Sequence, residues 1–206
     1  MSQELHAIAQ RITAAAADAE RFVAALAGPP GAGKSTLSEQ LWQAIDAELP
    51  GQVVVVPMDG YHFDNAVLGD EQIPFKGAPH TFDVAGLHAD LLRIRRADAA
   101  VAVPVFDRPL DLARAGGRIV ALEHRIILVE GNYLLLDQAP WCDLAPLFDL
   151  SVMLEVDDDE LERRLVERWR GMGQDPEAAL DKARNKDMLN ARLVKRHSRT
   201  PDLVWR

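Results

Sequence analysis

Cysteine is nearly absent from the sequence, since Cys142 is the only one among 206 residues. A single cysteine cannot form an internal disulfide or supply a cysteine-rich metal site. Aromatic residues are also sparse, at 6%, whereas 48% of the residues are hydrophobic. A chain of this length and composition can bury one sizeable core and is short for two. We therefore predict a single domain over residues 1–206.

Long apolar runs are missing as well. No stretch approaches the roughly 20 apolar residues that a membrane-spanning helix needs. The first residues, MSQELHAIAQRI, lack the apolar centre of a signal peptide. The formal net charge is −9, from 23 Lys and Arg residues against 32 Asp and Glu residues, whereas nucleic-acid partners require a basic face. We expect a cytoplasmic protein with no membrane and no nucleic-acid partner, and we leave open whether it forms a homo-oligomer.

The most informative stretch is rich in glycine and reads GPPGAGKST. It lies between an apolar run that ends at Ala27 and the helical pattern TLSEQLWQAI, and it matches the phosphate-binding template GxxxxGK[ST]. Glycines let the backbone curl so that several N–H groups converge on one anion at the start of the helix. The bland alternative is a glycine-rich turn with a surface lysine. The candidate ATP-binding residues are Gly28, Pro29, Pro30, Gly31, Ala32, Gly33, Lys34, Ser35 and Thr36.

Two residues of this loop have predicted roles in catalysis. Lys34 is expected to reach the β- and γ-phosphates of ATP as a point charge, and it is therefore also a catalytic candidate. The hydroxyl of Ser35 is expected to bind Mg²⁺, which bridges those phosphates. The predicted cofactors are therefore ATP and Mg²⁺.

Short buried strands alternate with helices along the whole chain. This alternation is typical of a parallel sheet that helices cover on both sides. We predict an α/β protein with a three-layer α/β/α P-loop NTPase fold and a mostly parallel five-stranded central sheet. The expected strands are 21–27, 53–57, a run that ends at Glu130, a run that ends near Val156 and an edge strand in DLVW, and the expected helices include 2–20, 83–97 and 176–195.

Carboxylates follow two of these strands, and ligands of such sheets bind at the carboxyl ends of the strands. Phosphoryl transfer to a hydroxyl needs a carboxylate that accepts the proton. Asp59 is our candidate, because we expect its strand, 53–57, to neighbour the phosphate-loop strand. Glu130 is the candidate that holds Mg²⁺ through a water. The alternative for both is a carboxylate that closes a turn at a strand end.

Five motifs then occur in order over most of the chain: GPPGAGKST, MDGYHFD, GAPHTFD, VPVFDR and VEGNYLLL. Together they resemble the uridine kinase, pantothenate kinase and phosphoribulokinase superfamily. The nearest resemblance is to the nucleoside kinase-like branch that is often labelled fructose transport system kinase. The resemblance implies an ATP-dependent kinase that phosphorylates a hydroxyl of a small polar metabolite, such as a sugar, a nucleoside or a pantothenate-like compound, with Asp59 as the catalytic base.

The resemblance also implies a set of substrate-binding residues. Asp83 ends a segment similar to one that binds ribose hydroxyls, although it also reads as the N-cap of the following helix. The chain departs from uridine kinases at Phe106, Asp111 and Glu160, where those enzymes have tyrosine, histidine and arginine, and it is much shorter than comparable pantothenate kinases. The acceptor therefore stays open. The candidate substrate-binding residues are Tyr61, His62, His80, Asp83, Phe106 and Arg108.

An arginine-rich segment, about 163–176, is similar to the mobile lid of this superfamily. Arginines there would close on the ATP phosphates and stabilise charge as it spreads in the transition state. We favour Arg163, as a catalytic residue, with Arg168 and Arg170 as ATP-binding residues. The alternative is a solvated helix face whose arginines pair with nearby glutamates.

Two other functions compete with a kinase: a GTPase-type switch, and a nucleotide-binding regulator without a small-molecule acceptor. Asp83 to Gly86 spells DxxG but does not follow a buried strand, and Asn185 to Met188 misses the guanine-reading NKxD by one place. The long irregular stretch 58–83 argues instead for a pocket that holds a second ligand.

Overall fold

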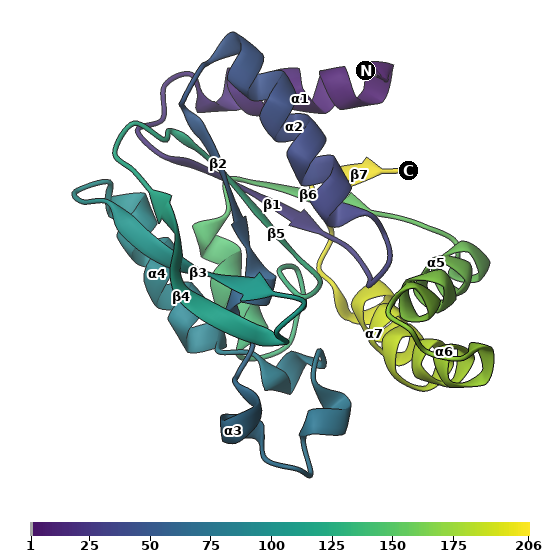
Figure 1. Cartoon of the computed structure of the whole chain (residues 1–206). Coiled ribbons are helices and arrows are strands. Elements are labelled where there is room, and N and C mark those ends of the chain that lie inside the picture. Colours follow the sequence, from purple (N-terminus) through teal and green to yellow (C-terminus); the bar gives the residue numbers. More distant parts are fainter. Residues whose placement is uncertain (1) are drawn as a thin grey trace.

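The computed structural model describes residues 2–206. Its centre is a five-stranded sheet with the order β2-β5-β1-β6-β7, in which all neighbouring strands run parallel (Figure 1). This confirms the predicted α/β/α fold, including the edge strand in DLVW. The strands are β1 (Phe22–Ala27), β2 (Val53–Pro57), β5 (Ile126–Gly131), β6 (Leu150–Leu154) and β7 (Leu203–Trp205).

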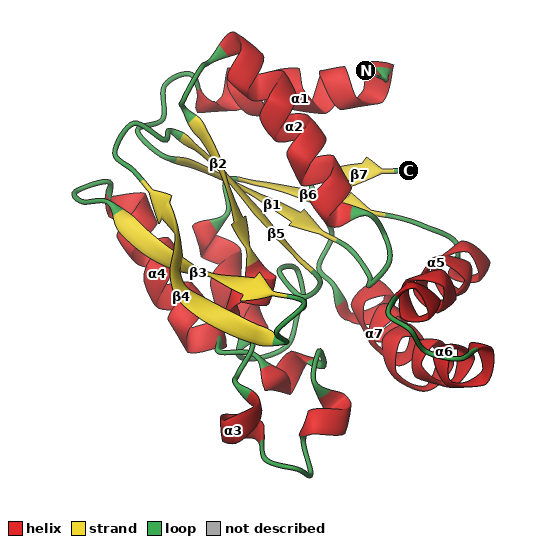
Figure 2. Ribbon diagram, in the orientation of Figure 1, coloured by secondary structure: helices red, strands yellow, loops and turns green. Residues whose placement is uncertain are grey.

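Helices cover both faces of this sheet (Figure 2). On one face, Ile12 and Leu41 pack into a cluster with inward-facing strand residues. On the other face, Leu87 and Leu91 pack into a second cluster. Along each of these helices the buried apolar residues recur at three- or four-residue spacing, so each helix turns one apolar stripe toward the sheet. The helices concerned are α1 (Gln3–Ala16) and α2 (Lys34–Glu48) on the first face and α4 (Val84–Arg96) on the second.

One predicted adjacency is wrong. We expected β2, which leads to Asp59, to lie beside β1, but β5 lies between them. Strand order in a doubly wound sheet does not follow chain order, because a later strand can insert between two earlier ones. Since all five strands are parallel, their carboxyl ends still meet at one edge of the sheet.

An antiparallel hairpin forms a second, two-stranded sheet from β3 (Val101–Asp107) and β4 (Leu112–Val120). The turn that connects the two strands is 108–111. Asp111 closes this turn in the left-handed region, with φ of 51°. The stretch before α4 consists of short 3-10 turns and one short helix, α3 (Asn65–Leu68).

The C-terminal helices lie at the carboxyl edge of the sheet, apart from its two faces (Figure 1). The predicted helix 176–195 is interrupted, because a π-helical turn (Ala183–Asp187) separates α6 (Pro176–Lys182) from α7 (Met188–His197). They follow α5 (Asp158–Gly171). Between residues 2 and 206, no helix is both long enough and apolar enough to cross a membrane.

Candidate functional site

The phosphate loop connects β1 to α2. Gly31 and Gly33 have φ of 81° and 93°, a region that favours glycine. The helix begins directly at Lys34, and no side chain caps its first turn. Its first N–H groups therefore remain free to bind an anion, with the positive end of the helix dipole behind them.

Lys34 lies at the base of this loop and is 8% exposed. Its Nζ donates a hydrogen bond to the carbonyl oxygen of Pro29 at 2.9 Å. Burial lowers the pKa of Lys34 to about 8, while the Glu130 and Asp59 carboxylates oppose that shift. A buried ammonium with one carbonyl partner has donors to spare for phosphate oxygens.

Glu130, at the end of β5, is also 8% exposed. Burial raises its pKa to about 7 and Asp59 adds to the shift, whereas Lys34, Arg108 and Ser35 oppose it. From residue 2 to residue 206, no group of three or more His, Cys, Asp or Glu side chains is arranged to hold a metal ion. The donor set of one carboxylate and one hydroxyl fits Mg²⁺, which keeps several waters and takes further oxygens from phosphates.

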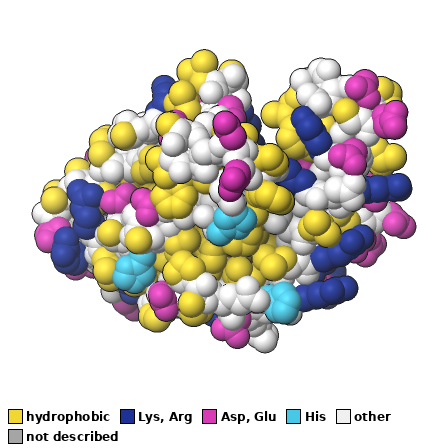
Figure 3. Space-filling view, turned by 90° about the horizontal axis from the view of Figure 1, so that it is seen from below, with side chains coloured by type: hydrophobic (Ala, Val, Ile, Leu, Met, Phe, Trp, Pro, Cys, Tyr) yellow, Lys and Arg dark blue, Asp and Glu magenta, His cyan; other side chains and the backbone are white. Residues whose placement is uncertain are grey.

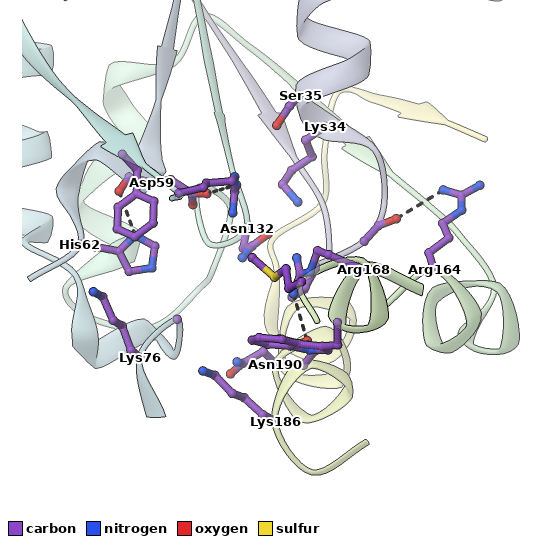
Figure 4. Close-up of a pocket in the computed structure, with 18 of the residues that line it drawn as sticks. Lys34, Ser35, Asp59, His62, Lys76, Asn132, Arg164, Arg168, Lys186 and Asn190 are labelled. Carbon is purple, nitrogen blue, oxygen red and sulfur yellow. Dashed lines mark hydrogen bonds and ion pairs between the residues drawn. The ribbon is translucent and has the colours of Figure 1, made fainter. Parts of the chain in front are cut away.

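Asp59 lies across the pocket from Lys34 (Figure 4). It sits in a 3-10 turn (Met58–Tyr61) directly after β2. Its Oδ2 accepts a hydrogen bond from Nη2 of Arg108 at 2.6 Å, so the β3–β4 turn supplies a cation to this carboxylate. His62 Nδ1 lies 2.8 Å from the Asp59 carbonyl oxygen, which ties the next pocket residue to the same turn.

Aromatic rings form the wall beside Asp59. The His62 ring lies 4.0 Å from the ring of Phe82 and 4.7 Å from that of Phe106, measured between centroids. Burial lowers the pKa of His62, although Asp59 opposes the shift. Lys76 closes the wall: its Nζ donates to Asn65 Oδ1 at 2.8 Å and forms an ion pair with Asp111. This wall offers flat apolar surface with a few polar groups to a small molecule.

Helix α5 forms the opposite rim, and the predicted lid arginines separate there. Arg168 lines the pocket and pairs with Asp187 at 3.0 Å. Arg163 instead lies on the outer face, where it pairs with Glu160 and Glu167. The structure therefore gives Arg163 the surface pairing that we had treated as the alternative. Arg170 does not line the pocket either.

The arginine that reaches the phosphate loop is Arg164, which the sequence prediction had passed over. Its Nη1 lies 3.4 Å from the carbonyl oxygens of Gly31 and Ala32. Leu161 and Leu165 pack beneath the loop, and a side-chain carbon placed on Gly31 would lie 3.1 Å from Leu165. This buried pair fixes which face of α5 meets the loop.

Three predicted substrate-binding residues lie outside the pocket lining. Tyr61 is 5% exposed and its hydroxyl donates to Asp90 Oδ2 at 2.9 Å. Asp83 caps α4, since its Oδ1 accepts from the Gly86 N–H at 2.8 Å. His80 is exposed and its Nε2 lies 2.9 Å from Gln72 Oε1. In this conformation their polar atoms form hydrogen bonds with other parts of the protein.

The pocket as a whole has a volume of about 670 Å³. Figure 3 shows the molecule from below, hollowed between the lobe that carries the C-terminal helices and the rest of the chain. Of the predicted residues, the pocket brings together part of the phosphate loop with Asp59, His62, Phe106, Arg108, Glu130 and Arg168. Sequence reasoning missed several lining residues, although Asn132 lies inside the VEGNYLLL motif: Lys76, Asn132, Arg164, Trp169, Met172, Lys186, Asp187 and Asn190.

Known proteins are similar to this chain over most of its length. No protein-family model matches the chain. It is 33% identical over 195 residues to a Schizosaccharomyces pombe protein named "Putative uridine kinase", covering 90% of this chain and 83% of that one. It is 31% identical over 153 residues to a pantothenate kinase of Sorangium cellulosum, covering 72% of this chain and 49% of that enzyme. The crystal structure of a "putative fructose transport system kinase" from Silicibacter sp. TM1040 superposes with a TM-score of 0.92 at 40% identity, over 100% of both chains.

Proposed function

The chain belongs to the uridine kinase and pantothenate kinase superfamily of P-loop kinases, and from this premise we propose that it transfers the γ-phosphoryl group of ATP to a hydroxyl of a small polar metabolite. One observation carries the proposal: the wall that carries the Asp59 carboxylate faces the phosphate loop across a single pocket. A regulator that only binds nucleotide would not need this second wall.

Each side of the pocket has its own task. Lys34 and the first N–H groups of α2 bind the β- and γ-phosphates, while Ser35 and Glu130 hold Mg²⁺. When bound, Mg²⁺ neutralises charge on the phosphates, and ATP supplies the phosphoryl group. Asp59 accepts the proton of the acceptor hydroxyl and orients its oxygen, and Arg108 holds that carboxylate in place. Arg168 lies between Lys34 and Lys186 in the pocket.

The test is Asp59→Asn. We expect turnover to fall by about 10²- to 10⁴-fold because the amide cannot accept the proton, while ATP affinity, measured by calorimetry, stays close to wild type. Asp70→Asn is the matched control: Asp70 is an exposed carboxylate in the following loop, outside the pocket. Full turnover in Asp59→Asn would contradict the role of Asp59. A lack of acceptor-dependent ADP release across nucleosides, sugars, sugar phosphates and pantothenate would contradict the kinase proposal.

A further inference from the structure

Lys186 differs from the other cationic side chains of the pocket, because its ammonium group forms no hydrogen bond or ion pair with any residue from 2 to 206. Four of the others form ion pairs and Lys34 donates to Pro29. The four pairs are Lys76 with Asp111, Arg108 with Asp59, Arg164 with Glu160 and Arg168 with Asp187.

The adjacent carboxylate, Asp187, does not serve as a partner for Lys186. Its Oδ2 already accepts from Arg168 at 3.0 Å and from Nε1 of Trp169 at 2.6 Å. Burial lowers the pKa of Lys186, and the Asp187 carboxylate opposes this shift. The ammonium lies 5.8 Å from the centre of the Trp169 ring. The half-buried ammonium is not one of the buried side-chain atoms that lack a partner, so it can exchange water for a bound anion, and a charge-assisted hydrogen bond to that anion is stronger than a neutral one.

The position of Lys186 separates it from the phosphate loop. It belongs to the π-helical turn Ala183–Asp187, and such turns interrupt the regular helical phase and occur often at functional sites. A side-chain carbon placed on Gly77 would lie 4.0 Å from Cε of Lys186, so the side chain extends toward the loop that carries Lys76. In Figure 4, Lys186 and Lys34 lie on opposite sides of the pocket, with Arg168 between them.

We propose that Lys186 recognises an anionic group, a carboxylate or a phosphate, on the alcohol that this kinase phosphorylates. The inference rests on the proposed function, because it places the acceptor hydroxyl at Asp59 and the rest of the acceptor toward Lys186. Asn190, one turn further along on α7, also lines this end of the pocket and forms no side-chain hydrogen bond within residues 2–206. An ammonium and an amide together suit a compact anion.

Matched pairs of neutral and anionic alcohols test this inference. ADP release with ATP and Mg²⁺ is measured for pantothenol against pantothenate, for glycerol against glycerate and glycerol 3-phosphate, and for ribose against ribose 5-phosphate. We expect kcat/KM for at least one anionic member to exceed that of its neutral partner by about tenfold or more, as a charge-assisted hydrogen bond would give. The carboxylate and phosphate members show which anion is recognised.

Lys186→Gln then assigns that preference to the side chain. We expect it to lower kcat/KM for the anionic alcohol by about 10- to 100-fold and to leave KM for ATP unchanged, while Lys186→Arg keeps part of the preference. The matched control is Lys182→Gln, because Lys182 also lies over the Trp169 ring, at 4.8 Å, but is outside the pocket lining and donates to Gln174.

The outcomes distinguish the two proposals. Turnover of neutral alcohols alone would overturn the role of Lys186 and leave the kinase proposal standing. An equal loss for neutral and anionic alcohols in Lys186→Gln, or a raised KM for ATP, would also overturn it. A lack of turnover with every alcohol of both kinds counts against both proposals.

Discussion

The two sides of the pocket are built in different ways. The phosphate side comes from one continuous stretch, residues 28–36, together with Glu130 on the strand that pairs with β1. The acceptor side gathers Asp59, Arg108 and Lys186 from three segments that are far apart in the chain. The first side can form its geometry from local sequence, whereas the second exists only once the whole fold has formed.

The two sides also differ in how far their charges are removed from water. Lys34 and Glu130 are each 8% exposed. The side chains of Asp59 and Arg108 are 24% and 57% exposed. Electrostatic interactions are stronger where water is excluded. We therefore expect single substitutions on the phosphate side to lower activity with every acceptor, and those on the acceptor side, apart from the catalytic base Asp59, to change the choice of substrate.

Among the substitutions other than that of Asp59, the largest effect is expected for Lys34→Ala. Removing a preorganised cation from a buried phosphate site should lower kcat by about 10²- to 10³-fold with any acceptor, measured at saturating ATP. Lys195→Ala is a suitable control, because Lys195 pairs with Asp158 on the outside of the C-terminal lobe. If Lys34→Ala is folded, as circular dichroism would show, and keeps the wild-type kcat, then Lys34 does not contribute to phosphoryl transfer.

The phosphate side could be predicted from sequence for a physical reason. Its template specifies a glycine at position 33, where φ is positive, and the helix begins at the lysine that follows, so motif and geometry coincide within nine residues. The sheet was predictable in the same way, because buried strands alternate with helices. The position of β5 between β1 and β2 was not, since chain order does not set strand order.

The acceptor side could be predicted only in part. Asp59 and His62 follow directly from the end of a strand. Lys186 could not be found, because the π-helical turn shifts helical phase by an amount that the sequence pattern does not show. Tyr61 and Asp83 were predicted to bind substrate, whereas the Tyr61 hydroxyl donates to Asp90 and the Asp83 carboxylate caps α4. The single domain, the oligomeric state and the acceptor stay predictions.

A second prediction uses the raised pKa of Glu130. The folded protein holds the proton more tightly, with a pKa of about 7 against 4.5 for the free group. The stability that Glu130 contributes is therefore complete below pH 4.5 and is lost as pH rises through about 7. Glu130→Gln stays neutral and lacks this loss. From pH 5 to pH 8, its free energy of unfolding should therefore rise relative to that of the wild type by up to about 3 kcal/mol. Urea unfolding of the nucleotide-free proteins measures this difference. If the free energies of unfolding of variant and wild type change with pH in parallel, the pKa of Glu130 is not raised by burial.

The smallest effect separates two adjacent arginines on α5. Arg163 and Arg164 both pair with Glu160, but only Arg164 reaches the carbonyl oxygens of the phosphate loop. Successive helix positions point about 100° apart, so burial of Leu161 and Leu165 turns Arg164 toward the loop and Arg163 toward solvent. The sequence offered this buried pair as a signal, and we had not used it to choose between the arginines.

Arg164→Ala should therefore raise KM for ATP by about tenfold, through loss of the charge-assisted contact between this side chain and the phosphate loop. Arg163→Ala is its matched control and should change neither KM nor kcat measurably, because exposed ion pairs contribute little. Steady-state kinetics at varied ATP measure both. Equal effects of the two substitutions would show that α5 does not present a fixed face to the phosphate loop.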